Sequence, residues 1–208
     1  DRERETLARL EHPHIARLYD AGLAADGQPY LALEHVDGQR IDRYCEEQRL
    51  GVRARLQLFL QAARAVAQAH AQLVVHRDIK PSNLLVDAQG QVKLLDFGIA
   101  RLLDAGHLPA SDVTQQGARA LTPDYAAPEQ IAGAAVGTRA DVYALGVLLF
   151  ELLTGARPYR LKRDSRAALE EAILAAEVPR PSEVAGDKAL RQALRGDLDT
   201  IVLKAMKK

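Results

Sequence analysis

The segment of residues 141–153 limits most strongly what this chain can fold into, because its side chains are apolar almost all round. A helix without a polar face has to be buried on every side. Gly146 and Glu151 interrupt the run, which is also much shorter than the roughly 20 apolar residues that a membrane-spanning helix needs. We therefore predict a central helix that other elements of a globular domain cover, and no membrane segment in this chain.

The composition is that of an ordinary globular domain. With 208 residues, of which 48% are hydrophobic and 27% charged, the chain can form one domain with a sizeable core. Lysine plus arginine and aspartate plus glutamate both total 28, so the net charge is zero and we expect no nucleic-acid partner. The single cysteine, Cys45, excludes an internal disulfide and fits a reducing compartment. We expect a cytoplasmic protein, or the cytoplasmic part of a larger or membrane-anchored one.

Local patterns predict an α+β fold with a mainly helical second part. Alternating apolar residues and turn signals favour strands at residues 15–19 and 30–36, and a hairpin of residues 84–86 and 92–95 around Gly90. Helical spacing favours helices at residues 53–71, 169–176 and 198–206. Residues 100–121 form a long irregular stretch that is a candidate switch, and residues 179–182 a surface connector.

Both ends of the chain are predicted to lie inside secondary structure. Residues 1–11 alternate charges with Leu7 and Leu10, as part of an amphipathic helix would. Residues 197–208 form a helix-like run with no capping glycine or proline beyond it. We therefore interpret the chain as truncated at both ends.

One stretch carries most of the chemistry, and it continues through the predicted hairpin. It reads His76-Arg77-Asp78-Ile79-Lys80-Pro81-Ser82-Asn83, and after the hairpin Asp96-Phe97-Gly98. If Val86 faces Lys93, then Leu84 faces Leu95 and Asn83 faces Asp96, at a Cα separation of roughly 5 Å. An amide oxygen and a carboxylate that meet in this way suit Mg²⁺, which takes few protein carboxylates and leaves positions for substrate phosphates.

Asp78 and Lys80 complete a phosphate-handling set. Asp78 lies five residues before Asn83 on a loop that Pro81 restrains, so its carboxylate can face the same cavity and accept a proton. Lys80 places a cation beside it that can neutralise charge on a transferring phosphoryl group.

These residues match the catalytic loop and the metal-binding Asp-Phe-Gly of protein kinases, so the chain resembles that family. Residues 122–129, with Ala127-Pro128-Glu129, look like its substrate-docking segment, and residues 140–146 like its central helix. The resemblance implies ATP and Mg²⁺ as cofactors and protein substrates with Ser or Thr acceptors. The implied roles are base for Asp78, phosphate-side cation for Lys80, magnesium ligands for Asn83 and Asp96, brace of the catalytic loop for Asp141, and contact to Asp78 and Lys80 for Thr122.

The resemblance also extends to the first lobe. Glu3 lies nine residues before His12, as the first-lobe helix glutamate does in the family. By the same alignment Leu33 is the gatekeeper, Glu34 to Val36 the hinge whose backbone meets adenine, and Leu85 the floor beneath it. Residues 1–35 would be a remnant of the first lobe and residues 36–208 the second lobe, incomplete at its C-terminal end. His76, a packing residue, would stack with Phe97, Leu7 and Leu18.

Regulation follows from the same resemblance. Arg77 beside the base is typical of kinases whose long loop is ordered by phosphorylation, with Thr114 as first acceptor and Ser111 as second. Self-association for trans-autophosphorylation is then expected. The remaining histidines lack ligand spacing and are predicted to be surface or packing residues. The residues in these motifs resemble those of bacterial members of the family.

The sequence departs from the family pattern at two places. No glycine-rich loop and no strand lysine precede Glu3, and the arginine that pairs with Glu129 in the family is not evident before Lys208. We therefore expect this fragment alone to be inactive. Two alternatives remain beside a protein kinase: a pseudokinase or scaffold, against which the four intact catalytic positions argue, and a small-molecule phosphotransferase, against which residues 122–129 argue.

Overall fold

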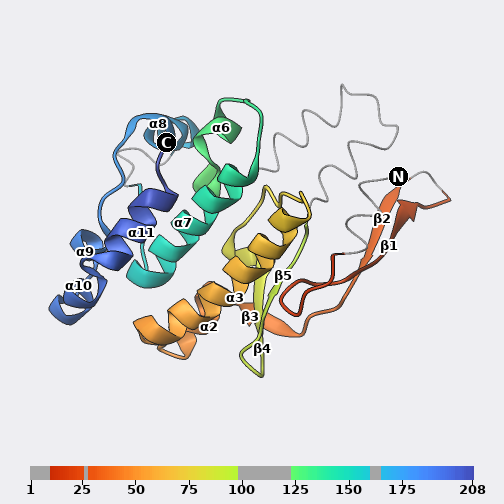
Figure 1. Cartoon of the computed structure of the whole chain (residues 1–208), viewed down its shortest axis with the longest axis horizontal. Coiled ribbons are helices and arrows are strands. Elements are labelled where there is room, and N and C mark those ends of the chain that lie inside the picture. Colours follow the sequence, from red (N-terminus) through yellow and green to blue (C-terminus); the bar gives the residue numbers. More distant parts are fainter. Residues whose placement is uncertain (1–9, 26–27, 98–122, 160–164) are drawn as a thin grey trace.

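The computed structural model describes residues 10–25, 28–97, 123–159 and 165–208 (Figure 1). The described residues form two small antiparallel sheets and a larger helical part, with helices α9 and α10 at the end far from strands β1 and β2. The predicted α+β class with a mainly helical second part is confirmed. No helix in the described ranges is long and apolar enough to cross a membrane.

The first sheet pairs β1 (Leu18–Leu23) with β2 (Pro29–Leu33) in antiparallel register. The predicted first strand began too early, because Ile15 forms an isolated parallel bridge with Leu94, and the Ala16 N–H donates to the Leu94 carbonyl at 2.9 Å. The predicted second strand ended too late, since β2 stops at Leu33. The segment before β1 therefore lies along the second sheet and ties the two sheets together.

The second sheet contains β3 (Gly38–Arg40), β4 (Leu84–Asp87) and β5 (Val92–Leu94) in that order. The predicted register of the hairpin is wrong by one residue, because Leu85 and not Val86 pairs with Lys93. Asp87 donates its N–H to the Gln91 carbonyl at 3.0 Å, and Gly90, at φ +74°, closes a loop of three residues between them. Asn83 consequently lies opposite Leu95, not Asp96.

Helix α7 (Thr138–Thr154) occupies the centre of the helical part, as predicted from its apolar surface. Val147, Leu148 and Phe150 have no exposed surface, whereas Val142 is 44% exposed. At Gly146 helix α11 approaches closely: an added Cβ would lie 2.7 Å from the Met206 side chain. The other helices are α2 (Ile41–Glu47), α3 (Val52–Ala71), α6 (Pro128–Ile131), α8 (Arg166–Ala175), α9 (Pro181–Val184), α10 (Lys188–Leu194) and α11 (Asp197–Ala205).

The prediction of a surface connector at residues 179–182 is wrong for its last two residues. Pro181 and Ser182 are buried and begin α9. Ser182 donates its N–H and its hydroxyl to the buried Asp199 carboxylate, at 2.9 and 2.7 Å. Polar residues that look exposed in the sequence are thus satisfied inside the helical part by a partner seventeen residues later.

Candidate active site

The loop between α3 and β4 brings three of the predicted catalytic side chains together. It ends in a short 3₁₀ turn, Pro81–Asn83, directly before β4. Lys80 Nζ lies 2.7 Å from Asp78 Oδ2. Asn83 Nδ2 donates to the Asp78 carbonyl at 2.8 Å and to Asp78 Oδ2 at 3.1 Å. The Asp78 side chain is 39% exposed, so its carboxylate is accessible to solvent.

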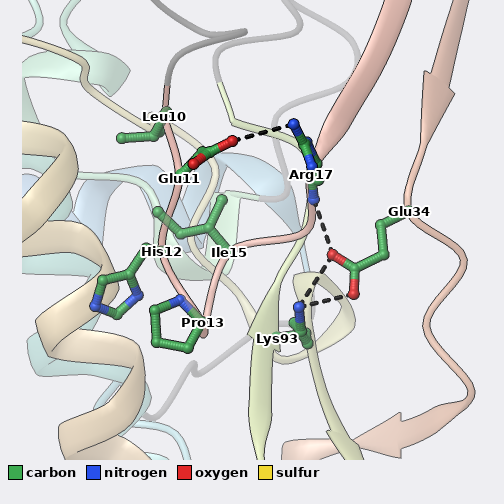
Figure 2. A pocket seen from close by; sticks show the side chains of 8 residues that line it. All are labelled: Leu10, Glu11, His12, Pro13, Ile15, Arg17, Glu34 and Lys93. Carbon is green, nitrogen blue, oxygen red and sulfur yellow. Dashed lines mark hydrogen bonds and ion pairs between the residues drawn. The ribbon is translucent and has the colours of Figure 1, made fainter.

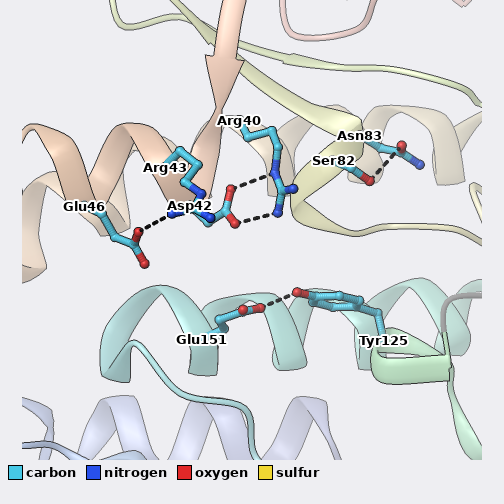
Figure 3. Close-up of polar contacts among 8 residues, drawn as sticks. All are labelled: Arg40, Asp42, Arg43, Glu46, Ser82, Asn83, Tyr125 and Glu151. Carbon is cyan, nitrogen blue, oxygen red and sulfur yellow. Dashed lines mark hydrogen bonds and ion pairs between the residues drawn. The ribbon is translucent and has the colours of Figure 1, made fainter. Parts of the chain in front are cut away.

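The amide of Asn83 has a defined orientation. Its nitrogen faces Asp78, so its Oδ1 points away, where it takes a long 3.5 Å hydrogen bond from Ser82 Oγ (Figure 3). Asn83 is only 7% exposed. An amide oxygen with so weak a protein partner is a hard donor of the kind that Mg²⁺ accepts, and the residues present therefore fit this ion.

Asp96 follows β5 at the end of the hairpin where Asn83 precedes β4. It adopts φ +61°, a left-handed conformation that costs a residue with a side chain roughly 1–2 kcal/mol. Its side chain is exposed, and in the described part of the chain no hydrogen bond joins it to Asn83. The carboxylates of Asp78 and Asp96 oppose the lowering of the His76 pKa that burial causes.

His76 anchors the loop to the strand that precedes Asp96. Its Nδ1 accepts the Asp78 N–H at 3.2 Å, so the ring proton is on Nε2, which donates to the Leu95 carbonyl at 2.7 Å. Burial lowers the pKa of His76, and the neutral ring packs edge-on against Phe97 with centroids 4.6 Å apart. The sequence pointed to packing but gave no sign of these two hydrogen bonds.

The buried Asp141 carboxylate holds the backbone before the base. Its oxygens accept the N–H groups of His76 and Arg77 at 2.8 and 2.7 Å. His70 Nε2 is 2.7 Å from the same carboxylate, although the sequence suggested only a surface or packing residue. Because Arg77 has φ +70°, Asp141 compensates an unfavourable backbone conformation directly beside Asp78.

Gln130, which the sequence did not single out, links the Ala-Pro-Glu segment to this loop. Its Nε2 donates to the Arg77 carbonyl at 2.9 Å, and its Oε1 accepts the Ala127 N–H at 2.9 Å. Glu129 beside it is partly buried and makes no ion pair with any described residue. The Arg77 Nε atom is buried without a hydrogen-bond partner among the described residues.

The predicted hinge begins where β2 ends. The Glu34 N–H donates to the Arg17 carbonyl at 2.8 Å. The Glu34 carboxylate lies 2.7 Å from Lys93 Nζ and accepts the Arg17 N–H at 3.0 Å, beside a cavity of about 370 Å³ (Figure 2). The hydrogen bond from Lys93 holds the pKa of Glu34 below its usual range. Val36 and Leu85 are partly buried, and Leu85 lies on the face of β4 opposite to the buried Leu84 and Val86.

The predicted docking segment is connected to α7 and to the residues after it. The Tyr125 hydroxyl donates to the Glu151 carboxylate (Figure 3). Arg157 pairs with Asp124, and its guanidinium lies 5.5 Å from the centre of the Tyr125 ring. Burial and the Glu151 carboxylate raise the pKa of Tyr125, so this hydroxyl stays protonated and donates. The predicted positions Glu3, Leu7, Ser111, Thr114 and Thr122 lie outside the described residues.

Comparison with known proteins agrees with the motifs. The protein kinase domain family matches residues 1–197. Over its whole length the chain is 36% identical to serine/threonine-protein kinase PknB of Mycobacterium tuberculosis, 34% to PrkC of Bacillus subtilis and 33% to pkn3 of Myxococcus xanthus. It covers 32%, 30% and 38% of these bacterial relatives, respectively, and so spans about a third of their length. The chain belongs to the protein kinase domain family.

Proposed function

We propose that the protein is an ATP-dependent serine/threonine kinase that transfers the γ-phosphate of ATP to hydroxyl groups of protein substrates. The observation that carries the proposal is the contact set of Asp78, Lys80 and Asn83 on one braced loop. The names of the relatives, all serine/threonine-protein kinases, support it.

The side chains have distinct tasks in this reaction. Asp78 orients the acceptor hydroxyl and takes its proton, and Lys80 neutralises charge on the phosphoryl group as it moves. Asn83 Oδ1 and the Asp96 carboxylate would hold Mg²⁺, which neutralises the phosphates when bound. The backbone from Glu34 to Val36 would meet adenine above Leu85. The neutral His76 and the buried Asp141 keep the loop in place.

The docking segment and the loop beside it give the proposed kinase its substrate class and its regulation. The links of Tyr125 and Asp124 to α7 and Arg157 support a rigid platform for a protein substrate. The Arg77 Nε, which has no hydrogen-bond partner among the described residues, supports a phosphate-binding role for this side chain, with Thr114 as the phosphorylated residue and a second copy as the enzyme. Glu3 would be the helix glutamate of the first lobe, and Thr122 would contact Asp78 and Lys80.

The test is to identify the acceptor. The complete protein is incubated with ATP and Mg²⁺, together with a mixed protein acceptor or a set of small alcohols and aminoglycosides, and the phosphorylated products are analysed. We expect phosphoserine and phosphothreonine. Transfer to small molecules alone would support a small-molecule phosphotransferase, and binding of ATP without any transfer would support a scaffold.

A further inference from the structure

Gln130 occupies an unusual position, because its side-chain amide joins the start of α6 to Arg77, which lies 53 residues before Gln130 in the sequence. The Ala127 N–H can only donate and the Arg77 carbonyl can only accept. The two hydrogen bonds therefore fix which end of the amide faces which segment. Ala127 has no exposed surface, so this end of the bridge is rigidly packed.

The Arg77 carbonyl belongs to the same peptide group as the Asp78 N–H. That peptide is held at both ends: Gln130 donates to its carbonyl at 2.9 Å, and its N–H donates to His76 Nδ1 at 3.2 Å. Since a peptide group is planar, these contacts determine its orientation and with it the direction in which the Asp78 side chain leaves the backbone. Asp141 instead accepts the N–H groups of the two preceding peptides, those of His76 and Arg77.

We propose that Gln130 is a positioning residue for the reaction: it sets the peptide of the catalytic base and couples this peptide to the substrate-docking segment. The inference deepens the proposed kinase function and rests on it. Gln130 acts through Arg77 and Asp78, and small displacements of a reacting group reduce the rate steeply.

The chain offers a matched control in Gln61. This glutamine is also partly buried and makes the same two kinds of contact, with Nε2 donating to the Gly90 carbonyl at 3.2 Å and Oε1 accepting the Val92 N–H at 2.8 Å. Its partners lie at the turn of the β4–β5 hairpin, away from Asp78. Equivalent substitutions therefore remove equivalent hydrogen bonds in the two places.

The experiment compares Gln130→Glu and Gln130→Met with Gln61→Glu and Gln61→Met in the complete protein. Glutamate keeps the acceptor for Ala127 but cannot donate to Arg77, and methionine removes both hydrogen bonds at similar volume. With all proteins folded at the assay temperature, we expect both Gln130 variants to lose about tenfold or more in kcat, with KM for ATP changed by less than about twofold. The Gln61 variants should keep kcat within about twofold.

Amide hydrogen exchange of residues 76–80 supplies a readout that does not depend on activity. Exchange should accelerate in the Gln130 variants and not in the Gln61 variants. An active parent whose kcat falls equally in the Gln130 and Gln61 variants, or in neither, would overturn the inference. A parent that transfers no phosphate would instead overturn the proposed function, and unchanged exchange in the Gln130 variants would then overturn the positioning role as well.

Discussion

The Glu34 carboxylate and the Lys93 ammonium lie 2.7 Å apart and join the end of β2 to β5. The sequence predicted a role at adenine for the backbone of Glu34. Its side chain, in addition, fixes the start of the proposed hinge to the strand that leads to Asp96, and Arg17 completes the junction. The nucleotide-binding and metal-binding parts of the proposed site are therefore linked by one ion pair.

Removal of this ion pair should loosen that link measurably. The two side chains are 27% and 20% exposed, so we expect a coupling of about 1 kcal/mol in a double-mutant cycle of Glu34→Gln and Lys93→Met, measured by denaturant unfolding. The pair Arg166 and Glu170, which is more exposed, serves as control and should show at most about 0.5 kcal/mol. Equal coupling in the two pairs would argue against a special role for Glu34.

The same contact predicts a pH dependence of stability. The pKa of Glu34 is lowered in the folded protein, so between that value and the usual one of 4.5 the unfolded chain binds the proton more readily. The stabilisation is complete above pH 4.5 and is lost as the pH falls through the lowered value. Unfolding of the parent and of Glu34→Gln should therefore differ at neutral pH and converge in acid; a constant difference would contradict this.

Asp141 should be among the residues most costly to replace. Asp141→Ala leaves the N–H groups of His76 and Arg77 buried without their acceptor, and we expect a loss of about 3–5 kcal/mol in the free energy of unfolding. Asp187 accepts one N–H group at the exposed start of α10, so Asp187→Ala should cost only about 1 kcal/mol. Similar losses from the two substitutions in thermal or denaturant unfolding would show that the brace is weak.

The elements predicted correctly from the sequence are those with a long, continuous pattern of apolar residues or a dense motif within one segment. Helix α7 and the residues of the catalytic loop could be identified because burial on all sides and a dense motif leave few alternatives. The hairpin register was missed because it depends on how Asp87 and Gly90 close the loop. From the sequence alone the loop could begin one residue earlier or later, and this shifts every pair of the hairpin by one position. The bond of His70 to Asp141 and that of Gln130 to Arg77 depend on contacts between distant segments, and no pattern around either residue indicates these partners.

Short elements were the other source of error. Strand β3 has only three residues, and its pairing with β4 gives no alternating pattern long enough to recognise. Helix α9 has four residues and begins at a proline, so residues 179–182 resembled a connector. In both cases tertiary contacts, and not local preference, determine the structure.

The central claim is that Asp78 is the base of a phosphoryl-transfer site. The most direct measurement is the single-turnover rate of transfer from bound Mg-ATP to a protein serine or threonine in the complete protein, for the parent, for Asp78→Asn and for the exposed control Asp197→Asn. We predict a loss of about 10²–10⁴-fold for Asp78→Asn, with ATP still bound, and a parental rate for the control. Transfer by Asp78→Asn at the parental rate would contradict the account.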